Sequence, residues 1–237
     1  MQKYSYLQGF KDGISIGLGY LSVSFTFGML ATSSGIPVWI AVFISMSNLT
    51  SAGQFAGLSL MLSGGSFFEM AITQLVINMR YALMSVSLSQ KLDKSVTLLH
   101  RFAISFFNTD EIFAVSSGKD GEVGTRYMYG LVTAPFIGWT LGTLFGAALN
   151  SFLPESIRSC LGIAIYAMFI AIVIPPAKKQ KAVALVAAIS VVLSCAFSYL
   201  PLLKTVSSGF VIIICSVVAA TVGAIIKPIE IEDKEES

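Results

Sequence analysis

The sequence predicts an all-α, polytopic membrane protein with about seven to eight hydrophobic segments, some of them discontinuous or re-entrant. Apolar residues make up 55% of the 237 residues and charged residues only 12%, a balance typical of membrane proteins. No charged residue occurs from Gly13 through Phe68, and later uncharged runs are near or above the roughly 20 residues that span a bilayer as a helix. The loops between these runs are too short for a soluble domain, so we expect one transmembrane domain over residues 1–237.

The first two membrane segments are expected to lie before Ser63. Residues 1–12 form a polar start, and the glycines and serines of residues 13–34 favour close packing against another helix. The turn Gly35-Ile36-Pro37 then opens a second segment, which ends near Leu62. Small residues flank Ser51 and Gln54 in this segment. We expect a break there, because a backbone without bulky side chains opens without clashes.

The third segment follows Ser63-Gly64-Gly65-Ser66 and carries Glu69, Asn78 and Arg80. Its start has the spacing of a helix capping box, so the sequence leaves open whether Glu69 is a cap or a site residue. Arg80 follows Glu69 by about three helical turns, too far for direct contact. Arg80 therefore needs a partner from another segment, unless it extends to the membrane interface. Asn78 points away from Arg80 if the helix is continuous, which leaves open an interruption between them.

The fourth segment, residues 102–117, carries Asn108, Thr109, Asp110 and Glu111 in its middle. One interpretation is a helix cap made by Asn108 and Glu111. The other interpretation is a discontinuous helix that exposes backbone groups to a substrate. The two are compatible, because a helix cap at bilayer depth is itself a break in a membrane helix. Two neighbouring carboxylates cannot both ionise cheaply in a low dielectric, so Asp110 and Glu111 are candidates for proton coupling.

Later segments are predicted over residues 127–149, 157–174, 182–199 and 205–226, and their scarcity of polar groups indicates a scaffold. Residues 228–237 form an acidic C-terminal tail. The glycine-rich segments 13–34 and 127–149 are each followed by a turn with proline and a further apolar run. A possible inverted repeat would explain this likeness.

The distribution of lysines predicts that both termini are cytoplasmic. Lysines occur near the N-terminus and again at residues 178–181. Eight simple crossings would put both groups inside, but they would also put Lys91 and Lys94 outside, against the positive-inside rule. Re-entrant pieces within the second to fourth segments would remove this conflict.

The charges in the apolar segments suit a zwitterionic ligand such as an amino acid, which needs a cationic partner for its carboxylate and an anionic partner for its ammonium group. Arg80 or a helix N-terminus is the candidate for the first role, and Asp110 or Glu111 for the second. The binding site is then expected between the two breaks, near residues 51–54 and 108–111. Its further lining is expected from Gln54 and Asn78, with Phe55 or Phe113 against the ligand side chain.

Four short motifs, in this order and spacing, resemble the AzlC-like branched-chain amino-acid exporters: Gly19-Tyr20, Ser51–Ala56, Asn78–Tyr81 and Thr109–Ala114. Residues Ala167–Ala171, after Leu153-Pro154, are also similar to a later segment of that family. The chain departs from the family pattern at Tyr81, where histidine is expected, and at Ser51, where alanine or glycine is commoner.

The resemblance implies secondary export of branched-chain or similar amino acids across the bacterial cytoplasmic membrane. It also implies a separate small hydrophobic membrane subunit of the AzlD type. Taken with the buried polar groups, it gives the following expected substrate-binding residues: Tyr20, Gln54, Asn78, Arg80, Asp110 and Glu111.

Other classes of function receive less support from the residues. An intramembrane enzyme needs a nucleophile with a base, or metal ligands, but the lone His100 has no HExxH or GxSxG motif near it, and the three cysteines have no CxxC spacing. No cofactor, nucleotide-binding loop or nucleic-acid partner is indicated. A structural or channel-like membrane subunit is the main alternative, and it would tolerate neutral replacements at Arg80 and Asp110.

Overall fold

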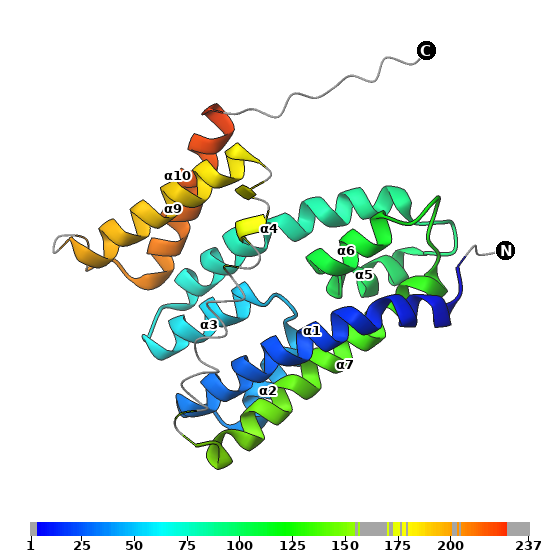
Figure 1. Cartoon of the computed structure of the whole chain (residues 1–237), viewed down its shortest axis with the longest axis horizontal. Coiled ribbons are helices and arrows are strands. Elements are labelled where there is room, and N and C mark those ends of the chain that lie inside the picture. The colour runs from blue at the N-terminus through cyan, green and yellow to red at the C-terminus, as the bar shows by residue number, and fades with distance from the viewer. Residues whose placement is uncertain are drawn as a thin grey trace. The chain divides into compact units, whose positions relative to one another are not determined.

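A computed structural model of the chain describes residues 4–154, 156, 170, 173–175, 177–178, 180–200, 203 and 205–226 (Figure 1). Its helices are α1 (Tyr6–Ser33), α2 (Val38–Ser47), α3 (Ala52–Leu62), α4 (Phe67–Lys91), α5 (Leu98–Phe106), α6 (Asp110–Ser117), α7 (Thr125–Leu149), the 3-10 turn η1 (Asn150–Phe152), α9 (Lys181–Tyr199) and α10 (Ser208–Ile226). The predicted all-α class is confirmed, since these elements account for the regular structure of the described residues.

Within the described residues, four helices are long and apolar enough to cross a membrane, namely α1, α7 with η1, α9 and α10. Two shorter apolar helices, α2 and α3, take the place of the second predicted segment. The chain forms two compact units. Unit 1 comprises Met1–Leu58 and Ile77–Tyr166, and unit 2 comprises Ser59–Val76 and Ala167–Ser237.

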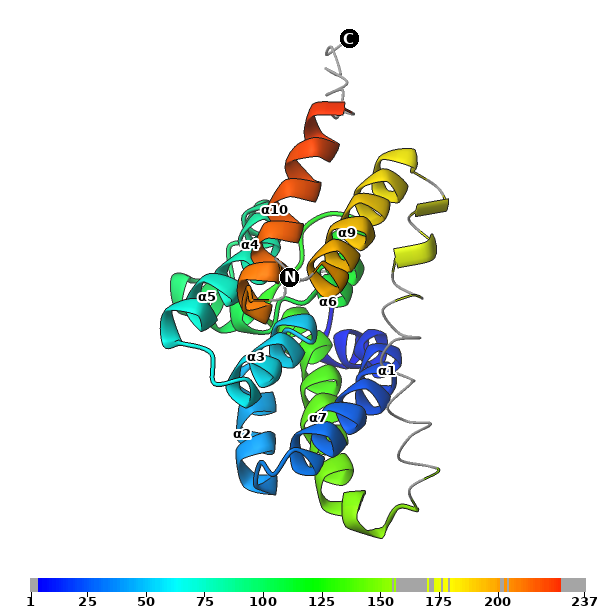
Figure 2. The same cartoon turned by 90° about the vertical axis from the view of Figure 1, so that its left-hand side faces the viewer.

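Helices α1 and α7 of unit 1 lie side by side over most of their lengths and run in the same direction (Figure 2). Gly9 faces the Tyr127 carbonyl near the start of α7, and Gly28 faces the Thr143 carbonyl near its end. A Cβ atom at either glycine would overlap the backbone of α7. The close packing predicted from the glycines of α1 is therefore confirmed, and it is direct backbone contact.

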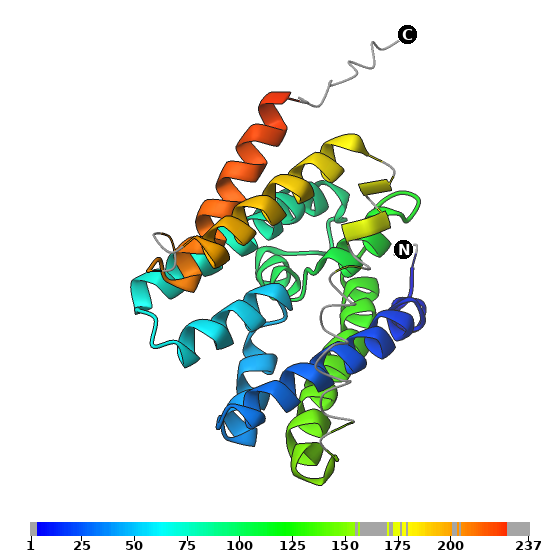
Figure 3. The ribbon, with the colours of Figure 1, turned by 60° about the vertical axis from the view of Figure 1, so that its left-hand side comes forward.

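Helices α2 and α3 form a hairpin that returns to the end of unit 1 from which it enters. Ala41 of α2 and Leu58 of α3 belong to one buried cluster with Ala31, near the end of α1. Gln54 lies near the start of α3, between Ala41 and Leu58 in the sequence. It accepts a hydrogen bond from Trp139 Nε1, in the middle of α7, at 3.2 Å. The predicted break is confirmed at residues 48–51, where α2 turns sharply into α3 (Figure 3).

Helices α5 and α6 form a second hairpin, which enters unit 1 from the opposite end. His100 Nδ1 lies 2.9 Å from the hydroxyl of Tyr129, near the start of α7. At the end of α5, the ring of Phe107 packs edge-to-face on Phe136, in the middle of α7, with centroids 5.3 Å apart. The predicted break of the fourth segment is confirmed at residues 107–109, between α5 and α6.

The second hairpin also returns to the end from which it entered. Just after α6, Lys119 Nζ lies 2.7 Å from Asp12 Oδ2, near the start of α1. The N–H of Val123 donates to the carbonyl of Lys91 at 2.9 Å, so the loops after α4 and α6 lie side by side. This end of unit 1 carries five cations, Lys11, Lys91, Lys94, Lys119 and Arg126, together with four acids, Asp12, Asp93, Asp120 and Glu122, and is here called the basic end.

This arrangement puts Lys91 and Lys94 at the same end of unit 1 as the start of α1, because each hairpin returns to the end from which it enters and α4 ends beside the start of α1. It also changes the expected internal repeat. The two matched glycine-rich segments correspond to α1 and α7, which run parallel, whereas an inverted repeat relates antiparallel elements. The opposed elements are instead the two hairpins.

In unit 2, α9 and α10 pack together, and Glu69 of α4 binds the start of α10. The Glu69 carboxylate accepts from the backbone N–H of Gly209 at 3.0 Å and from the Ser207 hydroxyl. Only half of the expected capping box forms, since Ser66 Oγ accepts from Glu69 N at 3.1 Å while the Glu69 side chain serves a different helix. A carboxylate is stabilised there because helix N-termini expose unpaired N–H groups.

Several predicted boundaries differ from the structure. Helix α1 begins at Tyr6 rather than Gly13, because Ser5 caps it by accepting from the N–H of Gln8 at 3.2 Å. The predicted segment 157–174, the motif Ala167–Ala171 and the tail 228–237 lie wholly or largely outside the described residues.

Candidate functional site

The break between α5 and α6 places two carboxylates in the first turn of α6. Asp110 and Glu111 follow Thr109, whose extended backbone begins the helix. Acids are favoured at this position because the N-terminal end of a helix carries partial positive charge. The alternative cap by Asn108 does not form, since the Asn108 side chain instead donates from Nδ2 to Ser85 Oγ on α4 at 3.1 Å.

Arg80 forms an ion pair with Asp110 across the gap between α4 and α6. The expectation that Arg80 takes a partner from another segment is therefore met. Its second terminal nitrogen donates to the hydroxyl of Tyr81 at 3.1 Å, and its guanidinium carbon lies 4.8 Å from the centre of the Tyr81 ring. The side chains of Arg80 and Asp110 are 45% and 43% exposed. Both charges are thus paired yet accessible to a ligand.

Tyr20 connects this charged break to α1. Its hydroxyl is hydrogen-bonded to Thr109 Oγ1 at 2.6 Å and to the carboxylate of Glu111. Its ring packs edge-to-face on Trp139 of α7, with centroids 5.2 Å apart. Tyr20 therefore joins the start of α6 to the α1–α7 pair.

Gln54 belongs to a buried, uncharged network at the other break. It is 2% exposed, and its Nε2 donates to Ser45 Oγ at 2.5 Å while its Oε1 accepts from Trp139 Nε1 at 3.2 Å. Ser45 is in turn hydrogen-bonded to Thr143 Oγ1 at 2.6 Å. Both the nitrogen and the oxygen of the Gln54 amide therefore have a hydrogen-bond partner, as a buried polar group requires.

The structure thus connects the two breaks through side chains that the sequence pointed to only in part. Gln54 contacts Trp139, Trp139 contacts Tyr20, and Tyr20 contacts Glu111. Trp139 was not among the expected site residues, and Thr109 was expected only as part of the second break. A single indole in a glycine-rich apolar helix was the available signal, because a buried indole N–H needs an acceptor.

Helix α4 is unbroken from Phe67 to Lys91, so the interruption left open between Asn78 and Arg80 does not occur. The half-buried Asn78 and the exposed Arg80 therefore point to different sides of one helix. The expected apolar wall does not form as one surface. Phe55 packs on Phe27 in the cluster at the end of α1, whereas Phe113 packs against a separate cluster on the side of the basic end.

The description "AzlC protein" belongs to the family model that matches residues 15–153. The chain belongs to the AzlC family. The matched region runs from α1 through η1 and so includes both breaks and all six expected binding residues.

Relatives in three organisms are similar to this AzlC-family chain. It is 28% identical over 196 residues to the inner membrane protein YgaZ of Escherichia coli K12, covering 78% of each chain. It is 30% identical over 155 residues to an uncharacterized membrane protein of Helicobacter pylori J99, covering 62% of this chain and 67% of the relative. It is 28% identical over 177 residues to an uncharacterized membrane protein of Archaeoglobus fulgidus, covering 74% and 77%. No solved structure matches the chain.

Family membership and the apolar helices together establish an AzlC-family membrane protein. Its candidate site combines a paired cation and anion, a second carboxylate and a phenol, all beside the N-terminal end of a short helix. Such a set of groups can bind a zwitterion and can take up or release a proton.

Proposed function

We propose that the protein is a secondary transporter that exports branched-chain or similar amino acids across the bacterial cytoplasmic membrane. The observation that carries this proposal is the half-exposed pair of Arg80 and Asp110, located at a helix break inside a membrane protein. Charges in membrane segments are costly, and discontinuous helices are the usual place where transporters bind polar substrates.

In the proposed mechanism the substrate exchanges with the ion pair. The carboxylate of the amino acid takes the place of Asp110 on the Arg80 guanidinium, a geometry that suits two parallel hydrogen bonds. The ammonium group then binds Asp110 or Glu111. When the ammonium group binds Asp110, the substrate replaces one paired arrangement of charges by another, and neither Arg80 nor Asp110 is left with an unpaired charge.

Proton coupling is the second part of the proposal, with Asp110 or Glu111 as carrier. Three features support it: the two carboxylates are adjacent, Asp110 already has Arg80 as counter-ion, and Glu111 is hydrogen-bonded to the Tyr20 hydroxyl. The ammonium group of the substrate binds only an ionised carboxylate, so substrate and proton compete for this group and substrate binding releases the proton.

The proposed orientation places the basic end of unit 1 in the cytoplasm, following the positive-inside rule. Both hairpins are then consistent with the rule, since the loops that carry Lys91, Lys94 and Lys119 all lie beside the start of α1. Both termini are proposed to be cytoplasmic, on the distribution of lysines near the N-terminus and at residues 178–181. A small hydrophobic AzlD-type subunit is the proposed partner, on the strength of the family resemblance.

Counterflow in proteoliposomes tests the proposal. The purified chain is reconstituted with and without the small subunit, vesicles are loaded with unlabelled L-leucine, and uptake of radiolabelled L-leucine is followed. A transporter accumulates label transiently above the equilibrium level, because it exchanges internal for external substrate. A channel-like or structural subunit gives only equilibration or no uptake, and that result would replace this proposal by the alternative.

A further inference from the structure

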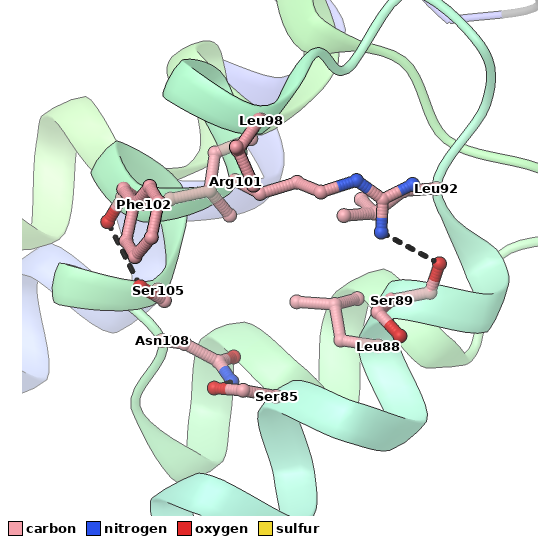
Figure 4. Close-up of a pocket in the computed structure, with 10 residues that line it drawn as sticks. Ser85, Leu88, Ser89, Leu92, Leu98, Arg101, Phe102, Ser105 and Asn108 are labelled. Carbon is pink, nitrogen blue, oxygen red and sulfur yellow. Dashed lines mark hydrogen bonds between the residues drawn. The ribbon is translucent and has the colours of Figure 1, made fainter.

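A cavity separate from the Arg80–Asp110 pair lies between the C-terminal half of α4 and α5 (Figure 4). Its walls are mostly apolar and include Leu88 and Ile104, both almost completely buried. At one side Asn108 and Ser85 lie together, and at another the long side chain of Arg101 crosses toward α4. The cavity therefore extends from the region near the basic end to the break between α5 and α6.

Asn108 has an unused hydrogen-bonding group at this cavity. The residue is only 3% exposed, and its Nδ2 donates to Ser85 Oγ at 3.1 Å. Among the described residues, no donor reaches its Oδ1. A buried acceptor without a partner costs roughly 1–3 kcal/mol, so such groups are normally satisfied by a ligand or a water molecule. Here the unsatisfied oxygen belongs to a side chain that lines a cavity.

The groups around this oxygen match the backbone of an amino acid. The Asn108 oxygen can accept from an ammonium group. The Ser85 oxygen already accepts from Asn108, which leaves the Ser85 proton available for a carboxylate. Leu88 and Ile104 then offer apolar surface to an aliphatic side chain. One donor, one acceptor and an apolar wall together are the elements of a small-molecule site.

Arg101 adds a positive charge to the lining of the cavity. Its Nη1 donates to the Ser89 carbonyl at 3.2 Å, and its Nε donates to the Val96 carbonyl at 3.3 Å. These carbonyls position the guanidinium but do not neutralise its charge. Arg101 is in neither of the two ion pairs found among the described residues. Its charge therefore attracts carboxylates toward the cavity.

We propose that the α4–α5 cavity is a second binding site for an aliphatic L-amino acid, a waiting position on the side of the basic end. This inference rests on the transport function proposed above. From this position the ammonium group passes to Asp110, which lies two residues after Asn108 at the start of α6. Arg101 attracts the substrate, Asn108 and Ser85 bind its polar end, and Arg80 and Asp110 receive it next.

The number of bound substrate molecules tests the proposal. The full chain is reconstituted in lipid nanodiscs, and binding of radiolabelled L-leucine is measured by equilibrium dialysis. We expect two sites per chain in the wild type and one site in Asn108→Ala. Arg80→Gln should also retain one site, the one that Asn108→Ala removes, and the double variant should bind none. Asn150→Ala is the matched control, because Asn150 is a buried asparagine already bonded to Ser33.

A second variant keeps the test decisive if Asn108→Ala does not fold. Leu88→Trp fills the cavity without removing a polar group, and it should lower the stoichiometry from two to one. A wild type that binds one leucine, unaffected by both variants, would overturn the waiting position while leaving the transport proposal in place. A wild type that binds no leucine, with or without the small subunit, would overturn both.

Discussion

The two helix breaks of unit 1 are alike in geometry and opposite in chemistry. The break at residues 48–51 lies beside a network of uncharged, buried side chains, whereas the break at residues 107–109 is followed by Asp110 and Glu111 and faces Arg80. Both interrupt a hairpin near the middle of α7. A break in this protein therefore does not by itself mark a binding site.

The first break is closed by its own residues. Asn48 Oδ1 accepts from the N–H of Thr50 at 3.2 Å and from its hydroxyl at 2.5 Å, as asparagine commonly does in turns. Ser51 has a positive φ of 45°, a left-handed conformation that is uncommon outside glycine and is held here by the flanking helices. Ser45, Thr143 and Gln54 satisfy one another nearby. No charged side chain occurs among residues 48–54.

The second break is held from outside by α1 and α4. Tyr20 and Arg80 bind the first turn of α6, and the charged partners stay half-exposed. Neutral groups can be buried once their hydrogen bonds are made, but charges keep a large desolvation cost even when paired. The difference between the breaks therefore supports the proposal that the second break binds the substrate and that the first is structural.

Removing either charge at the second break should have the largest effect. Arg80→Gln and Asp110→Asn should each lower L-leucine counterflow by about 100-fold or more, because a charge-assisted contact to the substrate is lost. Both variants should still insert and elute as folded protein. The exposed Arg126→Gln serves as control and should transport normally.

Pairing of the two residues is tested by the double variant. If Arg80 and Asp110 act as one unit, the double variant is no worse than either single one. Normal counterflow in both single variants would show that the binding site lies elsewhere and would erase the functional difference between the breaks.

Loss of the Glu111 carboxylate should weaken the coupling of transport to protons more than it weakens the exchange of leucine. In the wild type, an acidic exterior should drive export, since protons moving inward are exchanged for substrate moving outward. Glu111→Gln should keep at least part of the counterflow but lose most of the response to an imposed pH gradient, by about tenfold. Accumulation that needs a sodium gradient and ignores pH would contradict proton coupling.

Changes at the first break should act on stability. Gln54→Ala leaves the buried Trp139 N–H without its acceptor and opens a small cavity, so unfolding should become easier by about 1–3 kcal/mol. The midpoint of thermal unfolding in detergent measures this, with the exposed Gln90→Ala as control. A stable Gln54→Ala variant that has lost leucine binding would instead make the first break part of the site.

Tyr20→Phe should have the smallest effect, because it removes one hydroxyl and keeps the ring packed on Trp139. We expect transport to fall by about threefold to tenfold, the value of one hydrogen bond. An unchanged rate would mean that Tyr20 is a packing residue only.

Much of this site could be predicted from local chemistry. Small residues around Ser51 and the acids at residues 110–111 indicated both breaks, and the cost of an unpaired Arg80 indicated a partner from another segment. These inferences succeed because apolar surroundings penalise open backbone and single charges wherever they occur.

Other features depended on contacts between distant segments. Neither the return of the hairpins nor the contact of Trp139 with both Gln54 and Tyr20 is encoded in a short stretch of sequence. Glu69 is the clearest example, because its spacing from Ser66 fits a cap, yet its carboxylate binds the start of α10. Local spacing showed which groups were available and could not show which partner was nearer in space.

The backbone contact between α1 and α7 determines which parts of unit 1 are free to move. Gly138 and Gly146 face the backbone of Gly17 and Phe25, with no room even for a methyl group. Sliding one helix along the other by a turn, about 5.4 Å, would drive larger side chains into those positions. The pair is therefore expected to move as one rigid body. In the transport cycle proposed above, alternating access is then expected from rotation of the two short hairpins, whose helices have eight to 11 residues and are interrupted at residues 48–51 and 107–109.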